Sequence, residues 1–287
     1  MSIQWFPGHM NKALKEIEES LKKTDIIIEM TDARLPYSSC NPYIDTIREV
    51  KPTIKILNKA DLADPSITEM WINHYEMETG IKPLAISAET ASNVNQIPSL
   101  CKTIIKTSKL KNVRAMVVGI PNIGKSTLIN TIAGRKVNKV GNVPAITRHQ
   151  QRFGLKGLDI SDTPGILWAD IDDELKGLKL AASGAISNSV FDFQDVAFHT
   201  GNYLLKNYES LLIKRFKLKS VPKDGTELLE AIGRKRGCLK KGGVLDYYKA
   251  SDILLFELRT GLIGKISFET PDDIPDDIPD DITPETE

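Results

Sequence analysis

The 287-residue sequence has few cysteines, no long apolar run and no net charge, and the first two shortages each exclude a class of protein. Its three cysteines are far apart and form no CxxC pair, which excludes a disulfide framework and a cysteine-based zinc site. No apolar stretch reaches the roughly 20 residues that a membrane-spanning helix needs. The N-terminus lacks the charged and then apolar segments of a signal peptide. We therefore expect a cytoplasmic protein with no membrane partner.

The absence of net charge conceals an uneven distribution. The sequence has 38 Lys and Arg against 38 Asp and Glu, yet residues 271–287 (PDDIPDDIPDDITPETE) hold six Asp, two Glu and neither Lys nor Arg. The remaining residues carry a net charge of +8, and residues 201–268 alone have 14 Lys and Arg against 7 Asp and Glu. A basic surface of this kind suits contacts with nucleic-acid phosphates. The PDDI repeat combines proline with dense like charge, so it predicts a disordered tail.

Short apolar runs rich in isoleucine and valine alternate with helical patterns in the first part of the chain. We expect strands at 25–31, 53–58, 82–87, 113–119 and 157–162, a weaker strand at 149–155, and helices at 10–23, 66–78, 94–107 and 125–133. This alternation predicts an α/β fold, a mostly parallel sheet with helices on both faces. After about residue 175 the strand pattern fades, and helical segments follow at 208–217, 225–235 and 244–259. The expected domains are an α/β domain over 1–175, a smaller, mostly helical basic domain over 176–268, and an acidic tail over 269–287.

A phosphate-binding loop is the most informative motif. Residues 119–126 read GIPNIGKS and match G-x-x-x-x-G-K-[ST] between a strand and a helix. The alternative is a glycine turn that opens a helix beside a solvated lysine, but the agreement of motif and context favours the phosphate loop. Gly119 and Gly124 let the backbone curl so that its N–H groups face the nucleotide phosphates. Lys125 would bind the β- and γ-phosphate oxygens, and the Ser126 hydroxyl would bind Mg²⁺. The other loop residues expected to contact the nucleotide are Asn122, Ile123 and Thr127.

The tetrapeptide NKAD, which begins at Asn58, predicts the base. Asp61 can accept hydrogen bonds from both N1–H and the exocyclic amine of guanine, a donor pair that adenine lacks. Asn58 would tie this loop to the phosphate loop, and the Lys59 stem would cover the purine ring. Ser87 and Ala88 fit the loop whose backbone N–H meets guanine O6. Alone, NKxD is as well explained by helix-capping Asn and Asp, but beside a phosphate loop it favours a GTP site over an ATPase or kinase site.

The sequence DTPG at 162–165 is the expected sensor of the γ-phosphate. Asp162 would hold Mg²⁺ through a water, and the Gly165 N–H would face the γ-phosphate. Thr147 lies between the phosphate loop and DTPG, and it is the candidate for the threonine that closes on Mg²⁺ when GTP is bound. The alternative for Thr147 is an ordinary loop hydroxyl. The predicted ligands are therefore GTP or GDP with Mg²⁺.

The motifs occur in a rotated order. NKAD and the Ser87-Ala88 pair precede the phosphate loop and DTPG, whereas ordinary GTPases have the reverse order. A complete motif set in rotated order predicts a circular permutation, which is allowed because domain termini are often close together. The γ-phosphate-sensing segment then leads directly into the basic domain, so hydrolysis could move that domain.

With these motifs, the sequence resembles the circularly permuted GTPases, and within them the ribosome biogenesis GTPase A family (RbgA/YlqF). The resemblance covers residues 1–268 and includes the opening WFPGHMNKA and the DARLP at 32–36. It implies GTP hydrolysis coupled to late assembly of the large (50S) ribosomal subunit, with rRNA bound by the C-terminal domain. We expect no DNA specificity and a monomer off the ribosome. The acidic tail lies outside the family pattern.

The water-activating group has two candidates, because Ile166 stands where Ras-like GTPases have a glutamine. The resemblance implicates His9, whose imidazole can position or polarise water. The alternative is a loop histidine that packs or binds RNA. The second candidate is a K⁺ ion, since Asn122 resembles the asparagine that ligates K⁺ in related GTPases. The alternative for Asn122 is a turn residue that tolerates unusual backbone angles.

The basic segments 214–219 and 234–241 are the candidate rRNA contacts, against the alternative of solvated helix faces. For DARLP, a structural ion pair between Asp32 and Arg34 and a ribosome-facing site are both open. Two functions remain at this point. One is a GTPase that acts as a checkpoint in subunit assembly, and the other is a nucleotide-gated RNA- or protein-binding module with negligible hydrolysis.

Overall fold

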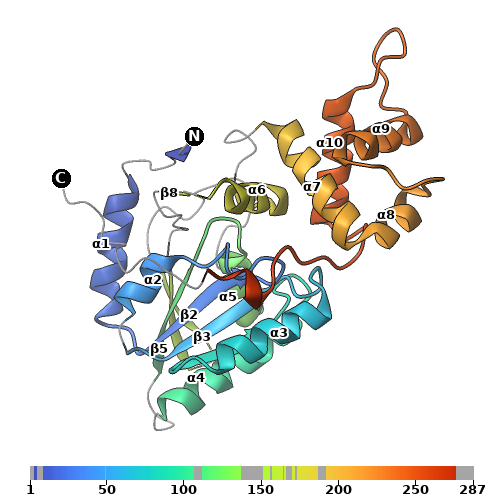
Figure 1. Cartoon of the computed structure of the whole chain (residues 1–287). Coiled ribbons are helices and arrows are strands. Elements are labelled where there is room, and N and C mark those ends of the chain that lie inside the picture. The colour runs from blue at the N-terminus through green and yellow to red at the C-terminus, as the bar shows by residue number, and fades with distance from the viewer. Residues whose placement is uncertain are drawn as a thin grey trace. The chain divides into compact units, whose positions relative to one another are not determined.

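The chain folds as two units in a computed structural model (Figure 1). The structure describes residues 3–4, 9–48, 50–106, 112–136, 151–155, 157–163, 165, 170–171, 173–186 and 192–275. The α/β unit comprises Gln4–Asp170 and Glu269–Glu287, and the helical unit comprises Met1–Ile3 and Ile171–Phe268. The two-residue strands β1 (Ile3–Gln4) and β8 (Asp170–Ile171) lie where the chain passes between the units. No helix among these residues is apolar over a length that would cross a membrane.

The α/β unit is built on a six-stranded sheet in the order β4-β3-β2-β5-β7-β6. Its strands are β2 (Ile26–Asp32), β3 (Thr53–Asn58), β4 (Ile81–Ala85), β5 (Val113–Gly119), β6 (Gln151–Leu155) and β7 (Leu158–Asp162). Neighbouring strands are parallel except β6 and β7, which are antiparallel. The predicted mostly parallel sheet is confirmed. The weaker, more polar candidate at 149–155 corresponds to the edge strand β6, which needs only a short turn to pair with β7.

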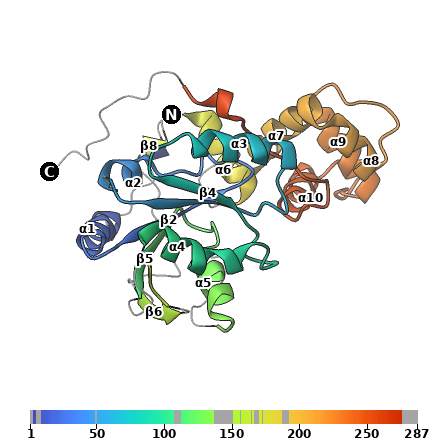
Figure 2. The same cartoon turned by 90° about the horizontal axis from the view of Figure 1, so that it is seen from below.

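Helices cover both faces of this sheet, as predicted. They are α1 (His9–Leu21), α2 (Pro42–Ile47), α3 (Pro65–Glu76), α4 (Ile97–Ile105) and α5 (Lys125–Ala133), with the short 3₁₀ helix η1 (Val94–Gln96) before α4. Figure 2 shows α2 and α3 on one side of the sheet and α4 and α5 on the other. The sequence pattern did not predict α2, because it has only six residues. Its start is set locally, since the Asn41 side chain accepts a hydrogen bond from the Tyr43 N–H at 3.0 Å.

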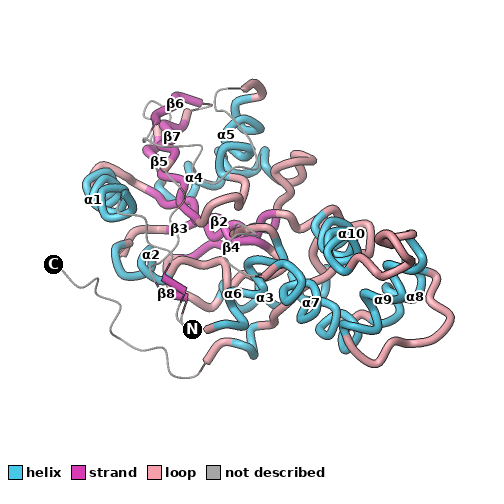
Figure 3. The backbone as a smooth tube through the Cα atoms, turned by 90° about the horizontal axis from the view of Figure 1, so that it is seen from above, coloured by secondary structure: helices cyan, strands magenta, loops and turns pink. Residues whose placement is uncertain are grey.

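The helical unit consists of helices that pack on one another (Figure 3). They are α6 (Glu174–Ser183), α7 (Phe193–Asn207), α8 (Glu209–Phe216), α9 (Gly225–Arg236) and α10 (Tyr247–Arg259). Three of them match the predicted segments, whereas α6 and α7 were not predicted. The buried face of α7 has helical spacing but includes Thr200 and Gly201, which weaken the apolar pattern. Gly201 is needed there because a Cβ atom would lie 3.0 Å from the Gly225 Cα.

The expected acidic tail over 269–287 is corrected at its start, because residues 269–274 pack on the α/β unit. The Trp71 indole Nε1 donates to the Glu269 carbonyl oxygen at 3.0 Å, and Ile274 packs against the buried cluster around Trp71. The 3₁₀ helix η2 (Pro271–Asp273) lies beside α3 (Figures 1 and 2). The composition of this segment predicts that it is unstructured, but these contacts hold it in one conformation. The rest of the expected tail, residues 276–287, lies outside the described residues.

Candidate nucleotide-binding site

The phosphate loop joins β5 to α5, in the position that the motif requires. Gly119 has a φ of 150° and Gly124 a φ of 103°, which side-chain-bearing residues rarely adopt. A Cβ atom would lie 2.6 Å from the Met30 carbonyl oxygen at Gly119, and 2.6 Å from the Asn58 Nδ2 at Gly124. Both glycines are therefore required by conformation and by close packing. The loop runs into the first turn of α5, where free backbone N–H groups favour an anion.

Lys125 is held beneath this loop. Its ammonium donates to the carbonyl oxygens of Gly119 and Ile120, both at 2.9 Å, and the residue is only 7% exposed. Burial lowers the pKa of Lys125 to about 8, although the negative charge of Asp162 partly opposes this shift. A cation that is already desolvated and oriented is well suited to bind phosphate oxygens, because a phosphate adds negative charge that favours the protonated ammonium.

Two oxygen ligands suitable for Mg²⁺ meet beside the loop. Ser126 lies in the first turn of α5 and Asp162 ends β7, and the Ser126 Oγ is 3.5 Å from the Asp162 Oδ2. Asp162 is fully buried, and a buried carboxylate needs compensating charge. Mg²⁺ prefers such hard oxygen ligands. The pair therefore fits the ion that its motifs imply.

Gly165 lies directly against the phosphate loop. A Cβ atom at Gly165 would lie 2.8 Å from the Cα and N of Pro121 and 3.1 Å from the Lys125 Nζ. The preceding Thr163 donates its hydroxyl to the Val117 carbonyl oxygen at 2.8 Å, which fixes the end of β7 against β5. The Gly165 backbone therefore lies close to the ammonium of Lys125, where a terminal phosphate would bind.

Asn58 connects three motifs through its buried side chain. Its Nδ2 donates to the Ile123 carbonyl oxygen in the phosphate loop at 2.7 Å, and its Oδ1 accepts from the Ala88 N–H at 2.9 Å. The Thr131 hydroxyl on α5 donates to the Ala88 carbonyl oxygen at 2.9 Å. The contact expected between NKAD and the phosphate loop is present. These hydrogen bonds bring NKAD, the loop at Ser87 and the phosphate loop to one place.

The remaining NKAD residues differ in how firmly they are held. Lys59 has a φ of 62°, and its ammonium is 3.0 Å from the Asp32 Oδ2. The Ala60 N–H donates to the Ile86 carbonyl oxygen at 3.0 Å, which aligns NKAD with the loop at Ser87. Asp61 is exposed, so its carboxylate is accessible to a ligand. This arrangement allows the Asp61 carboxylate to accept from a base while the phosphate loop holds the phosphates.

The structure gathers most of the predicted site residues at the carboxyl ends of the parallel strands, where open α/β sheets bind ligands. The residues brought together there are Asn58, Lys59, Asp61, Ser87, Ala88, Gly119, Ile123, Gly124, Lys125, Ser126, Asp162 and Gly165. Thr127 follows in α5, and Asn122 has a φ of 54°, the conformation that its simpler interpretation as a turn residue predicts. Thr147 lies outside the described residues. His9 begins α1, and its side chain is likewise outside the description.

Asp32 is a residue whose connection to the site the sequence did not indicate. It ends β2, parallel to and paired with β3, which ends at Asn58. Arg34 Nε donates to Asp32 Oδ1 at 2.9 Å and Arg34 Nη2 to Oδ2 at 2.8 Å, so DARLP contains the structural ion pair. The same carboxylate also binds Lys59 of NKAD. The sequence could have indicated this connection, because DARLP and NKAD each follow a predicted strand and these two strands are consecutive in the chain.

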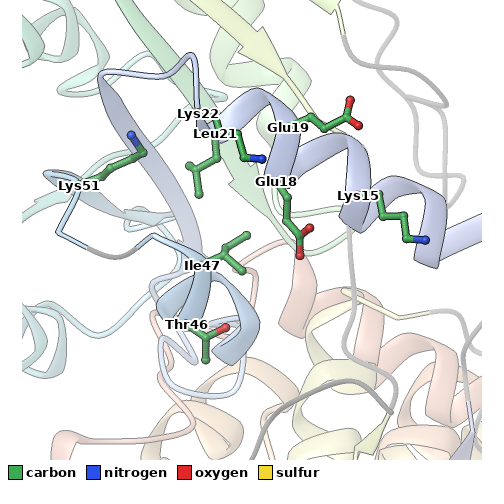
Figure 4. A pocket seen from close by; sticks show the side chains of 8 residues that line it. All are labelled: Lys15, Glu18, Glu19, Leu21, Lys22, Thr46, Ile47 and Lys51. Carbon is green, nitrogen blue, oxygen red and sulfur yellow. The ribbon is translucent and has the colours of Figure 1, made fainter. Parts of the chain in front are cut away.

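A pocket of about 640 Å³ between α1 and α2 is separate from these motifs (Figure 4). It is lined by Lys15, Glu18, Glu19, Leu21, Lys22, Thr46, Ile47 and Lys51. Glu18 accepts a hydrogen bond from the Tyr43 hydroxyl, which links the two helices. No nucleotide-binding motif lines this pocket, so it is not the candidate nucleotide site.

The helical unit brings its two basic segments together. Arg215 Nε and Arg236 Nη2 bind the two carboxylate oxygens of Glu257, each at 2.7 Å. The Lys235 ammonium donates to the Lys217 carbonyl oxygen at 3.0 Å. Segments 214–219 and 234–241 are therefore adjacent and form what we call the basic face. Its exposed cations are Lys214, Lys217, Lys219, Arg234, Lys235, Arg236, Lys240 and Lys241.

Comparison with known proteins agrees with this geometry. Residues 114–213 match the family model described as a 50S ribosome-binding GTPase. The match begins in β5 and excludes NKAD, in keeping with the rotated motif order. Two relatives named Ribosome biogenesis GTPase A are similar over nearly their whole length. The one from Bacillus cereus is 44% identical over 95% of both chains, and the one from Bacillus pumilus is 45% identical over 95% of this chain and 100% of its own.

A solved structure has the same fold. The crystal structure of GNP-bound YlqF from T. maritima has a TM-score of 0.65 and 29% identity, and the match covers 92% of this chain and 100% of that one. The assignment rests on sequence similarity over both units, on a phosphate loop hydrogen-bonded to NKAD, and on this shared fold. The chain belongs to the ribosome biogenesis GTPase A family of GTP-binding proteins.

Proposed function

We propose that this GTPase controls a late step in assembly of the large ribosomal subunit by binding rRNA through its helical unit in a nucleotide-dependent way. The observation that carries the proposal is the basic face, formed from two segments that are separate in the sequence. A clustered set of exposed cations is the usual footprint of a phosphate-binding surface. The chain also runs from DTPG directly into the helical unit, so a change at the γ-phosphate can reach that unit along the backbone.

In this proposal the nucleotide is read at three places. Asp61 accepts from the guanine base, and the Lys59 stem covers the ring. Lys125 and the loop N–H groups hold the phosphates, while the Gly165 N–H senses whether a γ-phosphate is present. Support comes from the Asn58 hydrogen bonds, which join the base-reading loop to the phosphate loop and so fix the distance between the two ends of the ligand.

The proposed metal is Mg²⁺, held by Ser126 and, through a water, Asp162, with Thr147 closing on it in the GTP-bound form. When bound, Mg²⁺ neutralises charge on the phosphate oxygens.

Asn122 is the proposed K⁺ ligand. The proposal keeps His9 as the residue that positions water. His9→Ala should lower subunit-stimulated turnover and leave GTP affinity unchanged, whereas lost nucleotide binding would assign His9 a structural role. A higher rate in K⁺ than in Na⁺ buffer would support the cation, and equal rates would exclude it.

The central experiment is co-sedimentation with purified 50S subunits in GDP or a non-hydrolysable GTP analogue, over a series of salt concentrations. We expect more binding with the analogue, and binding that falls steeply with salt because phosphate contacts release counterions. The double charge reversal K240E/K241E should weaken binding. The matched control is K22E/K23E, which changes a lysine pair on the α/β unit that is also exposed. Equal binding in both nucleotides, or a flat salt response, would contradict the proposal.

Turnover separates this function from the alternative of a binding module with negligible hydrolysis. We expect slow release of phosphate from GTP alone and a strong increase when subunits are added. The same rate with and without subunits would reject the coupling to assembly. A ribosomal partner of this kind also implies a cytoplasmic protein, and we propose that it is a monomer off the ribosome.

A further inference from the structure

The loop of residues 32–39, which we call the DARLP loop, links the guanine pocket to the segment that follows the helical unit. Its first residue, Asp32, is fully buried and binds Arg34 through both carboxylate oxygens. Its Oδ2 also lies 3.0 Å from the Lys59 ammonium. One carboxylate therefore holds the lysine of NKAD and the arginine of DARLP together.

This contact bears on the guanine pocket because Lys59 is the residue expected to cover the purine ring. Lys59 is held in a left-handed conformation, with a φ of 62°, and its ammonium is turned to Asp32. Burial alone would raise the pKa of Asp32, but the charges of Arg34 and Lys59 lower it well below its usual value, so Asp32 stays ionised. Burial would lower the pKa of Arg34, but the charge of Asp32 and, less strongly, the charge of Asp61 raise it, so Arg34 also stays charged.

The position of Asp32 depends on the rest of the DARLP loop. The Asp32 N–H donates to the Ser39 Oγ at 2.8 Å, and the Ser39 hydroxyl donates to the Leu35 carbonyl oxygen at 2.7 Å. The Leu35 N–H donates back to the Asp32 carbonyl oxygen at 2.9 Å. Each of these groups is buried, so a displacement of Ser39 would leave the Asp32 N–H without its acceptor.

Next to Ser39, the loop is held by a residue more than two hundred positions away. Ser38 donates its N–H to Glu269 Oε1 at 2.8 Å and its hydroxyl to Oε2 at 2.6 Å. Ser38 and Glu269 are each only 1% exposed, and the Trp71 indole holds the Glu269 carbonyl oxygen. A carboxylate buried in this way needs donors on both oxygens, and Ser38 supplies them. Glu269 is also the first residue after the helical unit.

We propose that Glu269 is a positioning residue of the guanine pocket, which acts through Ser38, Ser39 and Asp32 on Lys59. Docking of the segment 269–274 keeps the DARLP loop in the conformation that presents Asp32 to Lys59. Loss of that contact frees Lys59 and weakens binding of the base, while the phosphate loop is unaffected. The residue that follows the helical unit, Glu269, thus affects binding of the base. The segment that precedes the helical unit contains DTPG, which is expected to contact the γ-phosphate.

The test measures affinity and dissociation rate for a fluorescent GDP derivative in the full-length protein. Glu269→Ala should weaken GDP binding about tenfold, mainly through faster dissociation, and Ser38→Ala, which removes one of the two hydrogen bonds, about threefold. The matched control is Asp272→Asn, which removes one charge from an exposed residue of the same segment and should leave binding unchanged. At saturating GTP, kcat should stay within about twofold of the native value, because the reacting groups are untouched.

The route is tested in a Lys59→Ala background. There, Glu269→Ala should change GDP affinity less than twofold, because the residue through which it acts is gone. A tenfold loss in that background, or native affinity in both Glu269→Ala and Ser38→Ala, would overturn the proposal. If Glu269→Ala does not fold, Ser38→Ala and the isosteric Glu269→Gln decide the question. Native GDP affinity in both of these variants would likewise overturn it.

Discussion

Replacing Asn58 with alanine tests how far the nucleotide site depends on the junction between its loops. The change removes the hydrogen bond to the Ile123 carbonyl oxygen and the one from the Ala88 N–H, at 2.7 and 2.9 Å. Asn58 is 3% exposed, so its partners lose buried hydrogen bonds rather than surface ones. The sheet register of β3 does not depend on this side chain, and the overall fold should therefore persist.

The magnitude follows from the two hydrogen bonds. Each contributes about 1 kcal/mol net when both partners can return to water, and the cost rises to about 1–3 kcal/mol for a buried group left without a partner. Water can replace part of the lost contacts at the mouth of a ligand site, so we expect a total of about 2 kcal/mol. These two hydrogen bonds hold the two loops at the spacing that the ligand needs. If all of the lost energy of about 2 kcal/mol is taken from the binding free energy, GDP binds roughly 30-fold more weakly.

Calorimetric titration with GDP is the assay, with far-ultraviolet circular dichroism to confirm the fold. The control is Asn112→Ala, which removes an exposed asparagine that donates to Asp159 at 3.0 Å in the same unit, away from the nucleotide motifs. That variant should bind GDP normally. A folded Asn58→Ala protein whose GDP affinity stays within about threefold of native would refute the reasoning, because it would show that the loops keep their spacing without the junction.

Three further outcomes are expected. Burial lowers the pKa of Lys125 from 10.5 to about 8, and nucleotide phosphates favour its protonated form, so GDP affinity should fall as pH rises above 8 and lose this dependence in Lys125→Ala. The free energy of unfolding of the nucleotide-free protein should rise as pH goes from 8 to 10.5, because the unfolded chain binds more protons there. A GDP affinity and a stability that both stay constant over this range would contradict the burial of Lys125. Gly165→Ala places a Cβ 2.8 Å from backbone atoms of Pro121, so phosphate release from GTP should fall at least about tenfold, with GDP affinity nearly native; equal losses of both would argue against a role at the γ-phosphate. Glu257→Gln should lower the free energy of unfolding of the helical unit by about 1–2 kcal/mol, since two partly exposed arginines lose their shared charge, and an unchanged urea midpoint would exclude this.

The strands and the nucleotide motifs could be predicted because their signals are local. Apolar runs that are buried on both faces mark parallel strands, and β2, β3 and β5 carry such runs. The phosphate loop needs glycines at fixed spacing because Gly119 and Gly124 have φ angles of 150° and 103°, which residues with a side chain rarely adopt. Helices α6 and α7 were not predicted, because their burial depends on contacts with other helices rather than on a local pattern. The burial of a glycine or threonine in α7 depends on which helix packs against it, and the sequence of α7 does not record that.

By itself, the sequence determined the α/β class, the guanine nucleotide, the rotated order of the motifs and the basic character of the second unit. Tertiary structure alone decided which distant residues meet. It joined Asn58 to Ile123 and Ala88, merged two basic segments into one face, and seated Glu269 against Ser38 where composition suggested only an acidic tail. Local chemistry fixes what each segment can do. Partners far apart in the sequence are selected by the packing of the whole chain, because a buried polar group is stable only beside the donors or acceptors that packing brings to it.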